Sequence, residues 1–160
     1  MRSPLPVVLG AVINRNNILL IRKNKSLFTD LWGLPSSKIQ SGENIDQAVL
    51  RGIKEKTNID AKYEGLLASI SEVLAEAGST LDHFLIFLCK LQTDNYSYND
   101  SPEGKLRWFS LDEIDNYKQI MIPSDFEMIK KIVLDGNQGN FNSLIEKTNS
   151  NYELKKFERF

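Results

Sequence analysis

The stretch RGIKEK, residues 51–56, carries side chains whose types and spacing suit the binding of ions or phosphates. In a helix, positions 52, 55 and 56 lie on one face, within about 100° of arc. These positions hold Gly52, Glu55 and Lys56. A carboxylate is a preferred ligand of hard divalent cations, whereas a lysine ammonium repels such a cation and attracts a phosphate as a point charge. The face therefore combines one potential metal ligand with one potential phosphate ligand.

A helix over residues 44–57 is predicted to hold these side chains. Asn44 is a favourable N-cap, and Gln47 follows it at the spacing of a capping box. Apolar residues recur behind them at helical spacing, namely Ile45, Ala48, Val49 and Ile53. Asn58 falls where a residue with positive φ often ends a helix. The helix is thus expected to have one buried stripe and one exposed face.

Strands are expected before and after this helix. Residues 7–15 and 18–23 are rich in β-branched and apolar side chains, and the turn-prone residues between them predict a hairpin. Residues 63–74 and 83–91 are two further strand candidates, and residues 105–110 form a short one. The loop before the first helix contains Trp and Pro and connects it to the hairpin.

Two more helices are expected near Ser110 and Ser124, because a Glu follows each of them at capping-box spacing. The stretch DGNQGN, from Asp135, predicts a break. We therefore expect a domain over residues 1–135 and a C-terminal helix or tail over residues 136–160, packed on that domain or extending from it. The order of elements favours an α/β fold with a mixed sheet covered on both faces.

The composition fits a soluble protein with one core. The chain has 160 residues, of which 41% are hydrophobic and 26% are charged. A formal net charge of -1 gives no reason to expect binding to nucleic acid or to a membrane. Cys89 is the only cysteine, so no internal disulfide is possible and a reducing cytoplasm is the expected location. Either a monomer or a homodimer is compatible with these features.

Residues 32–59, WGLPSSKIQSGENIDQAVLRGIKEKTNI, resemble the Nudix box, the signature loop and helix of the Nudix hydrolase superfamily. The family pattern is a Gly, five residues, a Glu, seven residues, and then Arg-Glu-aliphatic-any-Glu-Glu-any-Gly-aliphatic. The chain matches this pattern at Glu43, Arg51, Ile53, Glu55 and Ile59, and differs from it at Ser37, Gly52, Lys56 and Asn58. The resemblance covers about four-fifths of the chain and implies a Nudix-type α/β/α sandwich.

The resemblance also implies a reaction, which is hydrolysis of a diphosphate linked to another group, often a nucleoside. Mg²⁺ or Mn²⁺ serves this reaction by neutralising charge and activating water. Glu55 and Glu103 are then the candidate catalytic residues, and Glu43 joins them as a candidate metal ligand. Glu103 stands in the loop SPEGKLRW, and the alternative for it is an exposed turn residue. Residues with an implied structural role in the box are Arg51, Ser37 and Asn58.

Gly52 and Lys56 change the charge of the implied metal site. Where the family pattern has three acidic positions, this chain has one carboxylate and one ammonium. A like-charge contact at 4 Å costs about 4 kcal/mol at an effective dielectric constant of 20. A divalent cation is therefore expected to bind weakly or not at all. Lys56, with Arg22 and Lys38, is a candidate for phosphate binding without metal, and the alternative for Lys56 is a solvated helix residue.

Two functional hypotheses remain open from the sequence. In the first, the chain is a diphosphate hydrolase with a weakened metal site and reduced or atypical activity. In the second, it is a catalytically inactive Nudix-fold module that binds a nucleotide or phosphate ligand, or a protein partner. Both hypotheses share a small phosphorylated, nucleotide-like ligand as the expected partner.

Overall fold

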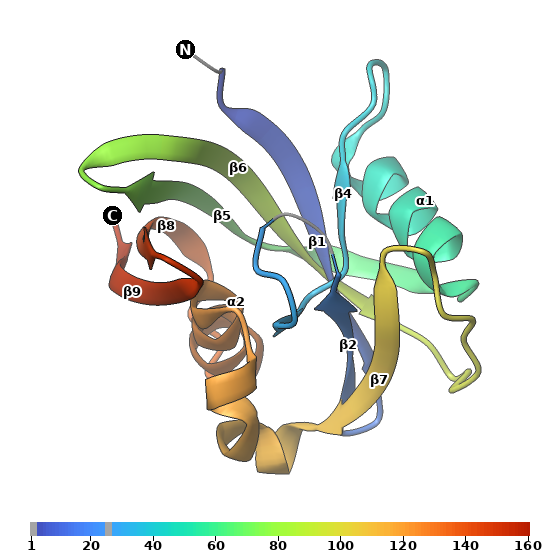
Figure 1. The fold of residues 1–160 in the computed structure, drawn as a ribbon. Coiled ribbons are helices and arrows are strands. Elements are labelled where there is room, and N and C mark those ends of the chain that lie inside the picture. The colour runs from blue at the N-terminus through green and yellow to red at the C-terminus, as the bar shows by residue number, and fades with distance from the viewer. Residues whose placement is uncertain (1–2, 25–26) are drawn as a thin grey trace.

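The computed structural model describes residues 3–24 and 27–160, and Figure 1 shows a curved sheet with helices packed against both faces. The sheet within these residues has nine strands in the order β3-β2-β1-β6-β5-β8-β9, with β4 paired to β1 and β7 paired to β2. The strands are β1 (Leu5–Asn14), β2 (Asn17–Lys23), β3 (Trp32–Gly33), β4 (Ser36–Lys38), β5 (Lys62–Glu76), β6 (Ser79–Gln92), β7 (Gly104–Ser110), β8 (Gly139–Thr148) and β9 (Asn151–Arg159). The helices are α1 (Ile45–Thr57), the 3-10 helix η1 (Leu111–Ile120), α2 (Pro123–Glu127) and the π-helix η2 (Met128–Leu134).

The sheet is mixed. Strand β1 runs parallel to β6, and β5 runs parallel to β8, whereas the other paired strands are antiparallel. The hairpin expected near the start of the chain is present, with Ile13 opposite Ile18 across the turn. These pairings, together with the helices on the two faces, confirm the predicted α/β/α arrangement.

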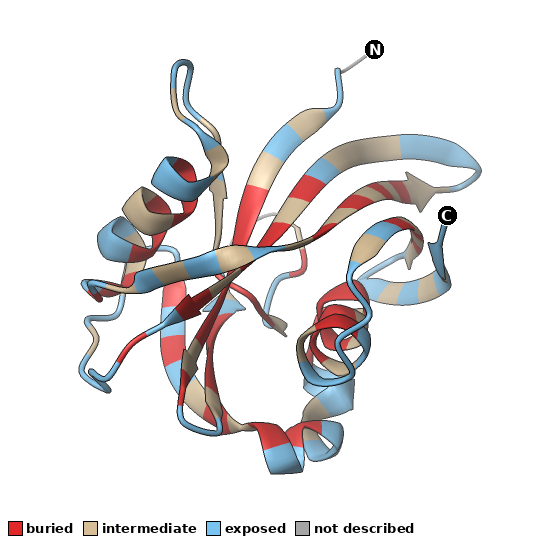
Figure 2. Ribbon diagram, turned by 180° about the vertical axis from the view of Figure 1, so that it is seen from behind, coloured by how far each residue is buried: buried red, intermediate tan, exposed pale blue. Residues whose placement is uncertain are grey.

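The core has two parts because successive residues of a strand point to opposite faces of the sheet. On β1, Val8 contributes to the layer under α1, and its neighbour Leu9 contributes to the layer under α2 and η2. Figure 2 shows buried residues in red along the central strands and on the inner sides of the helices. Helix α1 is consequently fixed to the sheet by its buried stripe, with its other side facing solvent.

The C-terminal segment differs from the sequence-based expectation. Residues 136–160 were expected to form a helix or a tail, but they contain β8 and β9, which form a hairpin that extends the sheet beside β5. The period of burial explains this result, because Phe141, Ser143 and Ile145 are buried at every second position of β8. Asn149 adopts a φ of 58° in the two-residue turn, a conformation that Asn tolerates better than most residues.

The segment between β7 and β8 is helical, as predicted, but its geometry differs in detail. Ser110 is the N-cap residue of η1, which is a 3-10 helix and not an α-helix. Helix α2 begins at Pro123, a residue suited to the first helical turn, so Ser124 lies inside the helix and is not its cap. Among the described residues, none of the helices has the length and apolar character needed to cross a membrane.

Candidate functional site

Helix α1 is held at both of its ends as the sequence predicts. The backbone N–H of Asn44 donates a hydrogen bond to Gln47 Oε1 at 2.8 Å. Asn58 has a φ of 63°, and its N–H donates to the carbonyl oxygen of Lys54 at 2.9 Å. These caps set where α1 begins and ends, and its buried stripe, packed on the sheet, sets the direction in which its polar side chains project.

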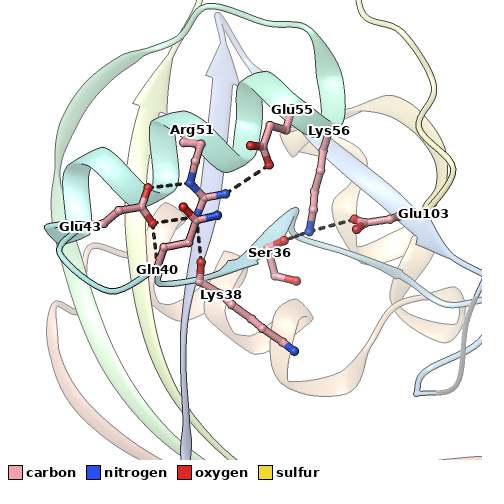
Figure 3. Close-up of polar contacts among 8 residues, drawn as sticks. All are labelled: Ser36, Lys38, Gln40, Glu43, Arg51, Glu55, Lys56 and Glu103. Atoms are coloured by element: carbon pink, nitrogen blue, oxygen red, sulfur yellow. Dashed lines mark hydrogen bonds and ion pairs between the residues drawn. The ribbon is translucent and has the colours of Figure 1, made fainter.

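Arg51 is the centre of the polar network on α1 (Figure 3). Its Nε lies 2.6 Å from Glu43 Oε2, and its Nη2 lies 2.8 Å from Glu43 Oε1. The same guanidinium donates to Glu55 Oε2 at 3.2 Å and to the carbonyl oxygen of Lys38 at 2.9 Å. This bidentate geometry ties the loop before α1 to the helix itself.

Glu43 is fully engaged within this network. Its Oε1 also accepts a hydrogen bond from the backbone N–H of Gln40 at 2.8 Å. The hydrogen bonds from Arg51 are the main cause that lowers the pKa of the Glu43 carboxyl, so Glu43 is a carboxylate at neutral pH. Both of its oxygens already accept hydrogen bonds from protein donors, and its charge is balanced by a guanidinium.

Lys56 does not project into solvent. Its ammonium lies 2.9 Å from Glu103 Oε2 and donates a hydrogen bond to the carbonyl oxygen of Ser36. The side chain of Lys56 is 17% exposed, whereas that of Glu103 is 49% exposed. Figure 3 shows Lys56 crossing from α1 toward β4 and Glu103 approaching from the loop before β7. Glu103 therefore meets the lysine of α1 and does not join Glu43.

Gly52 packs directly against Ser37 of β4. A methyl group added at Gly52 would overlap Ser37 Oγ and lie 2.6 Å from Ser37 Cβ. A side chain at position 52 thus has no space in this structure. The box has exchanged its small and large positions here, since the family pattern has Gly at position 37 and Glu at position 52.

The acidic residues present do not fit a resident divalent cation of the kind that the box resemblance implies. No group of three or more His, Cys, Asp or Glu side chains is placed to hold a metal ion in the part of the chain that the structure describes. Glu43 is neutralised by Arg51, and Glu103 is paired with Lys56. Glu55 is 60% exposed and contacts only one nitrogen of Arg51 among the described hydrogen bonds. The carboxylates Glu43, Glu55 and Glu103 are therefore not assembled as one ligand set.

A cavity of about 190 Å³ lies beside this network, on the other side of Ser36. Apolar side chains form most of its wall, and they are Val7, Leu9, Leu27, Phe28, Leu34, Phe84, Ile86 and Ile122. Three ionisable side chains also line it, and they are Lys23, Glu72 and Asp125. A small cavity with apolar walls and a few polar groups is typical of ligand sites.

The ionisable groups of the cavity have specific hydrogen-bond partners. Asp125 Oδ2 accepts a hydrogen bond from the backbone N–H of Leu34 at 2.8 Å, and Glu72 Oε1 accepts one from Ser143 Oγ at 3.0 Å. Burial raises the pKa of Glu72 to about 7 and that of Asp125 to about 6. Burial also lowers the pKa of Lys23, while the nearby Asp125 carboxylate acts in the opposite direction. Near neutral pH, the cavity can therefore present both proton donors and acceptors.

The cavity and the surface of α1 share a border. A groove of about 520 Å³ is lined by Lys38, Gln40, Arg51, Glu55, Lys56 and Glu103 among others, and it shares Val7, Ser36 and Phe84 with the cavity. Lys23 Nζ lies 3.3 Å from Ser36 Oγ, on the cavity side of the same residue whose carbonyl binds Lys56. The two spaces are therefore adjacent, one mostly apolar and the other polar, and we refer to them together as the cleft.

The predicted phosphate ligands separate into two groups. Lys38 and Lys56 both line the groove. Arg22 forms an exposed ion pair with Asp30 at 3.2 Å and lines a different depression, beside Lys105. Arg22 is therefore not brought together with the other two residues.

Sequence reasoning missed the three ionisable residues of the cavity. Glu72 carried a usable signal, because it falls between Ile70 and Leu74 on the buried face of β5. An acidic residue at such an inward position is uncommon and marks a functional or structural polar site. Lys23 and Asp125 carried no comparable pattern, since Lys23 is the last residue of β2 and Asp125 lies in a helix of only five residues.

The sequence was compared with protein-family models and with known proteins. The family model described as the NUDIX domain matches residues 4–132. Nudix hydrolase 5 of Arabidopsis thaliana is 27% identical over 146 residues, which cover 87% of this chain and 48% of that relative, so the chain spans about half the length of this relative.

Two solved structures show the same fold. A mutator MutT protein from Bacillus halodurans superposes with a TM-score of 0.75 at 23% identity, covering 96% of both chains. The NUDIX domain of NrtR from Shewanella oneidensis, solved in complex with ADP ribose, superposes with a TM-score of 0.68 at 17% identity and covers 82% of this chain and 87% of that one. At these identities the likeness concerns the fold.

Proposed function

The chain belongs to the NUDIX family, and we propose that its cleft binds a phosphorylated, nucleotide-like molecule and that its hydrolase activity is reduced or atypical. The observation that carries this proposal is the border between the two spaces at Ser36. A nucleotide has a planar base, with faces that pack against apolar groups and a polar edge, and a charged phosphate chain. The apolar cavity suits the base, and the groove with Lys38 and Lys56 suits the phosphates.

The ionisable groups of the cavity support a base as the buried part of the ligand. Asp125 and Glu72 can each exist in the protonated or the ionised form near neutral pH, because their pKa values are about 6 and about 7. They can therefore donate or accept hydrogen bonds at the edge of a ring. The apolar walls exclude water and strengthen such bonds.

Reduced hydrolysis follows from the charges around α1. A divalent cation would meet the Lys56 ammonium, and the positions of the missing carboxylates offer it no ligand. Glu55 is the least engaged acidic side chain of the groove, and we assign to it any remaining activation of water. The NUDIX domain of NrtR, which shares the fold of this chain, was solved with ADP ribose. That complex supports a nucleoside diphosphate derivative as the ligand class.

Calorimetric titration with ADP and with inorganic pyrophosphate tests the binding proposal. ADP is expected to bind more tightly than pyrophosphate, because only ADP places a base in the cavity. Leu27→Trp narrows the cavity and should remove this difference while leaving pyrophosphate binding in place. Equal binding of ADP to the wild type and to Leu27→Trp would contradict the assignment of the cavity.

Phosphate release from a panel of nucleoside diphosphate derivatives tests the reduced activity. We expect slow turnover that Glu55→Gln lowers by roughly 10²-fold, the lower range for loss of a general base. If turnover is absent in the wild type, the chain is a binding module without hydrolysis, and the Lys56–Glu103 ion pair favours that second candidate. Fast magnesium-dependent turnover would contradict the reduced activity.

A further inference from the structure

Ser36 lies between two lysine side chains that come from different elements. Lys23, at the end of β2, places its ammonium 3.3 Å from Ser36 Oγ. Lys56, near the end of α1, donates from its ammonium to the carbonyl oxygen of the same serine. Burial is the main cause that lowers the pKa of Lys23, and the charge of the nearby Lys56 acts in the same direction. Two cations are thus held together at the border between the cavity and the groove.

Each of the two lysines has an acidic neighbour, which is Asp125 for Lys23 and Glu103 for Lys56. Lys56 has Glu103 as its ion-pair partner, and Glu103 is about half exposed, on a loop before β7. Because the Glu103 side chain is about half exposed, water can solvate its carboxylate when it leaves Lys56. Lys56 is mostly enclosed and keeps the Ser36 carbonyl as a second partner. An incoming phosphate therefore competes with a half-exposed carboxylate for a well-positioned ammonium.

The two ammonium groups together carry the charge of one divalent cation. We propose that Lys23 and Lys56 form a built-in dication that binds the diphosphate of the ligand without metal, and that Glu103 is the counter-ion that the diphosphate displaces. This inference rests on the proposed function, because it concerns the same cleft. It adds that magnesium is not needed for binding and that one acidic residue of the groove opposes binding.

The contact between Ser37 and Gly52 supports this inference independently. The space that a carboxylate at position 52 would need is filled by Ser37. The helix therefore lacks both the charge and the room for the metal ligand, while β4 is close enough to α1 for Lys56 to reach the Ser36 carbonyl. The same close packing that excludes a ligand at position 52 places the ammonium at the border of the cavity.

Titration calorimetry with inorganic pyrophosphate and with ADP, in EDTA and in excess magnesium, tests the proposal on the full chain. Both probes should bind in EDTA at least as tightly as in magnesium. Lys56→Ala should weaken binding by roughly tenfold, the size expected for loss of one charge-assisted hydrogen bond. Glu103→Gln should tighten binding severalfold, and this exposed substitution also serves if Lys56→Ala fails to fold. Lys54→Ala is the matched control, because Lys54 lies on the same helix but pairs with Asp60.

The outcomes separate the inference from the proposed function. Binding that requires magnesium, or that is unchanged in both Lys56→Ala and Glu103→Gln, overturns the built-in dication and leaves the ligand-binding cleft in place. Failure of both probes to bind the wild type, with and without magnesium, overturns the proposed function and this inference with it. Equal weakening in Lys54→Ala and Lys56→Ala would show a general effect of helix charge and would also overturn the specific role of Lys56.

Discussion

At position 52 of α1, glycine is present because Ser37 fills the space where a side chain would lie. Glycine inside a helix costs roughly 1 kcal/mol relative to alanine. The close contact with Ser37 explains why glycine is present at this position despite its cost. The two residues form one packing unit, and a change at either of them depends on the other.

A double-mutant cycle measures this dependence. Gly52→Ala alone should lower the free energy of unfolding by about 1–3 kcal/mol through overpacking, less the gain in helix propensity. In a Ser37→Gly background the same substitution should raise the free energy of unfolding by up to about 1 kcal/mol. Urea unfolding measures both values. An identical effect of Gly52→Ala in the two backgrounds would show that the contact does not limit position 52.

The packing unit also governs any attempt to rebuild a metal site. Gly52→Glu with Lys56→Glu restores the acidic residues of the family pattern, but the new side chain at position 52 collides with Ser37. Restored affinity for magnesium is thus expected only when Ser37→Gly is added.

Glu72 makes the stability of the protein depend on pH. Its pKa is about 7 in the folded state because it is buried, compared with 4.5 for an ordinary glutamate. Between these values the folded state holds a proton that the unfolded state has lost, so the free energy of unfolding falls as the pH rises from about 4.5 to about 7. The full effect is roughly 3 kcal/mol.

Glu72→Gln removes this titration and retains hydrogen-bonding atoms near Ser143. Chemical unfolding between about pH 5 and about pH 7 should show a shallower fall in this variant than in the wild type. Some fall should remain, because Asp125, with a pKa raised to about 6, contributes with the same sign. Equal slopes for the wild type and Glu72→Gln would mean that Glu72 ionises normally in the folded protein.

At the scale of elements, the order of the longer strands and of the helices up to η2 could be predicted because their signals are local. The short strands β3 and β4 were missed, since they lie in the segment that was expected to be a loop. Strands β1, β5 and β6 show dense apolar and β-branched residues, and α1 has both of its caps in the sequence. Strands β8 and β9 were missed because their segment is polar and charged. The turn residues at 149–150 were one local signal. Residues 141–145, FNSLI, do not alternate between apolar and polar side chains in the sequence, although their burial alternates in the structure.

Removing β8 and β9 should prevent stable folding of the rest of the chain. A chain of residues 1–135 would expose Glu72 and the edge of β5, and it would lose the burial of Phe141 and Ile145. Each such side chain contributes about 1.5–3 kcal/mol, a large part of the 5–15 kcal/mol typical of a domain. Circular dichroism during heating should therefore show no cooperative transition.

A chain ending at residue 150 is the control for this truncation. It keeps β8 and its pairing with β5, and it loses only the mostly exposed edge strand β9. This chain should unfold cooperatively at a lower temperature than the full chain. If residues 1–135 unfold cooperatively on their own, β8 is an accessory strand and the expected domain boundary at residue 135 is a real one.

At the scale of the whole molecule, the cleft is the least predictable feature. Its walls come from β1, β2, β4, β5, β6, α1, α2 and the loops between them, and no local pattern shows that these elements meet. The box made it possible to predict that Lys56 lies near the site. It could not reveal that Lys23 approaches the same serine from the other side, because that contact depends on how β2 and β4 pack in three dimensions.

The sheet of this protein pairs strands that are far apart in the sequence. Strand β1 pairs in parallel with β6, and Ser143 on β8 contacts Glu72 on β5 from 71 residues further along. Pairings of this kind require large loops to close before they yield any favourable contact, so such proteins fold slowly. During synthesis on the ribosome, β5 and the carboxyl of Glu72 remain uncovered until β8 has emerged. The nascent chain therefore exposes an unpaired strand edge, and helper proteins that shield such edges would act during this interval.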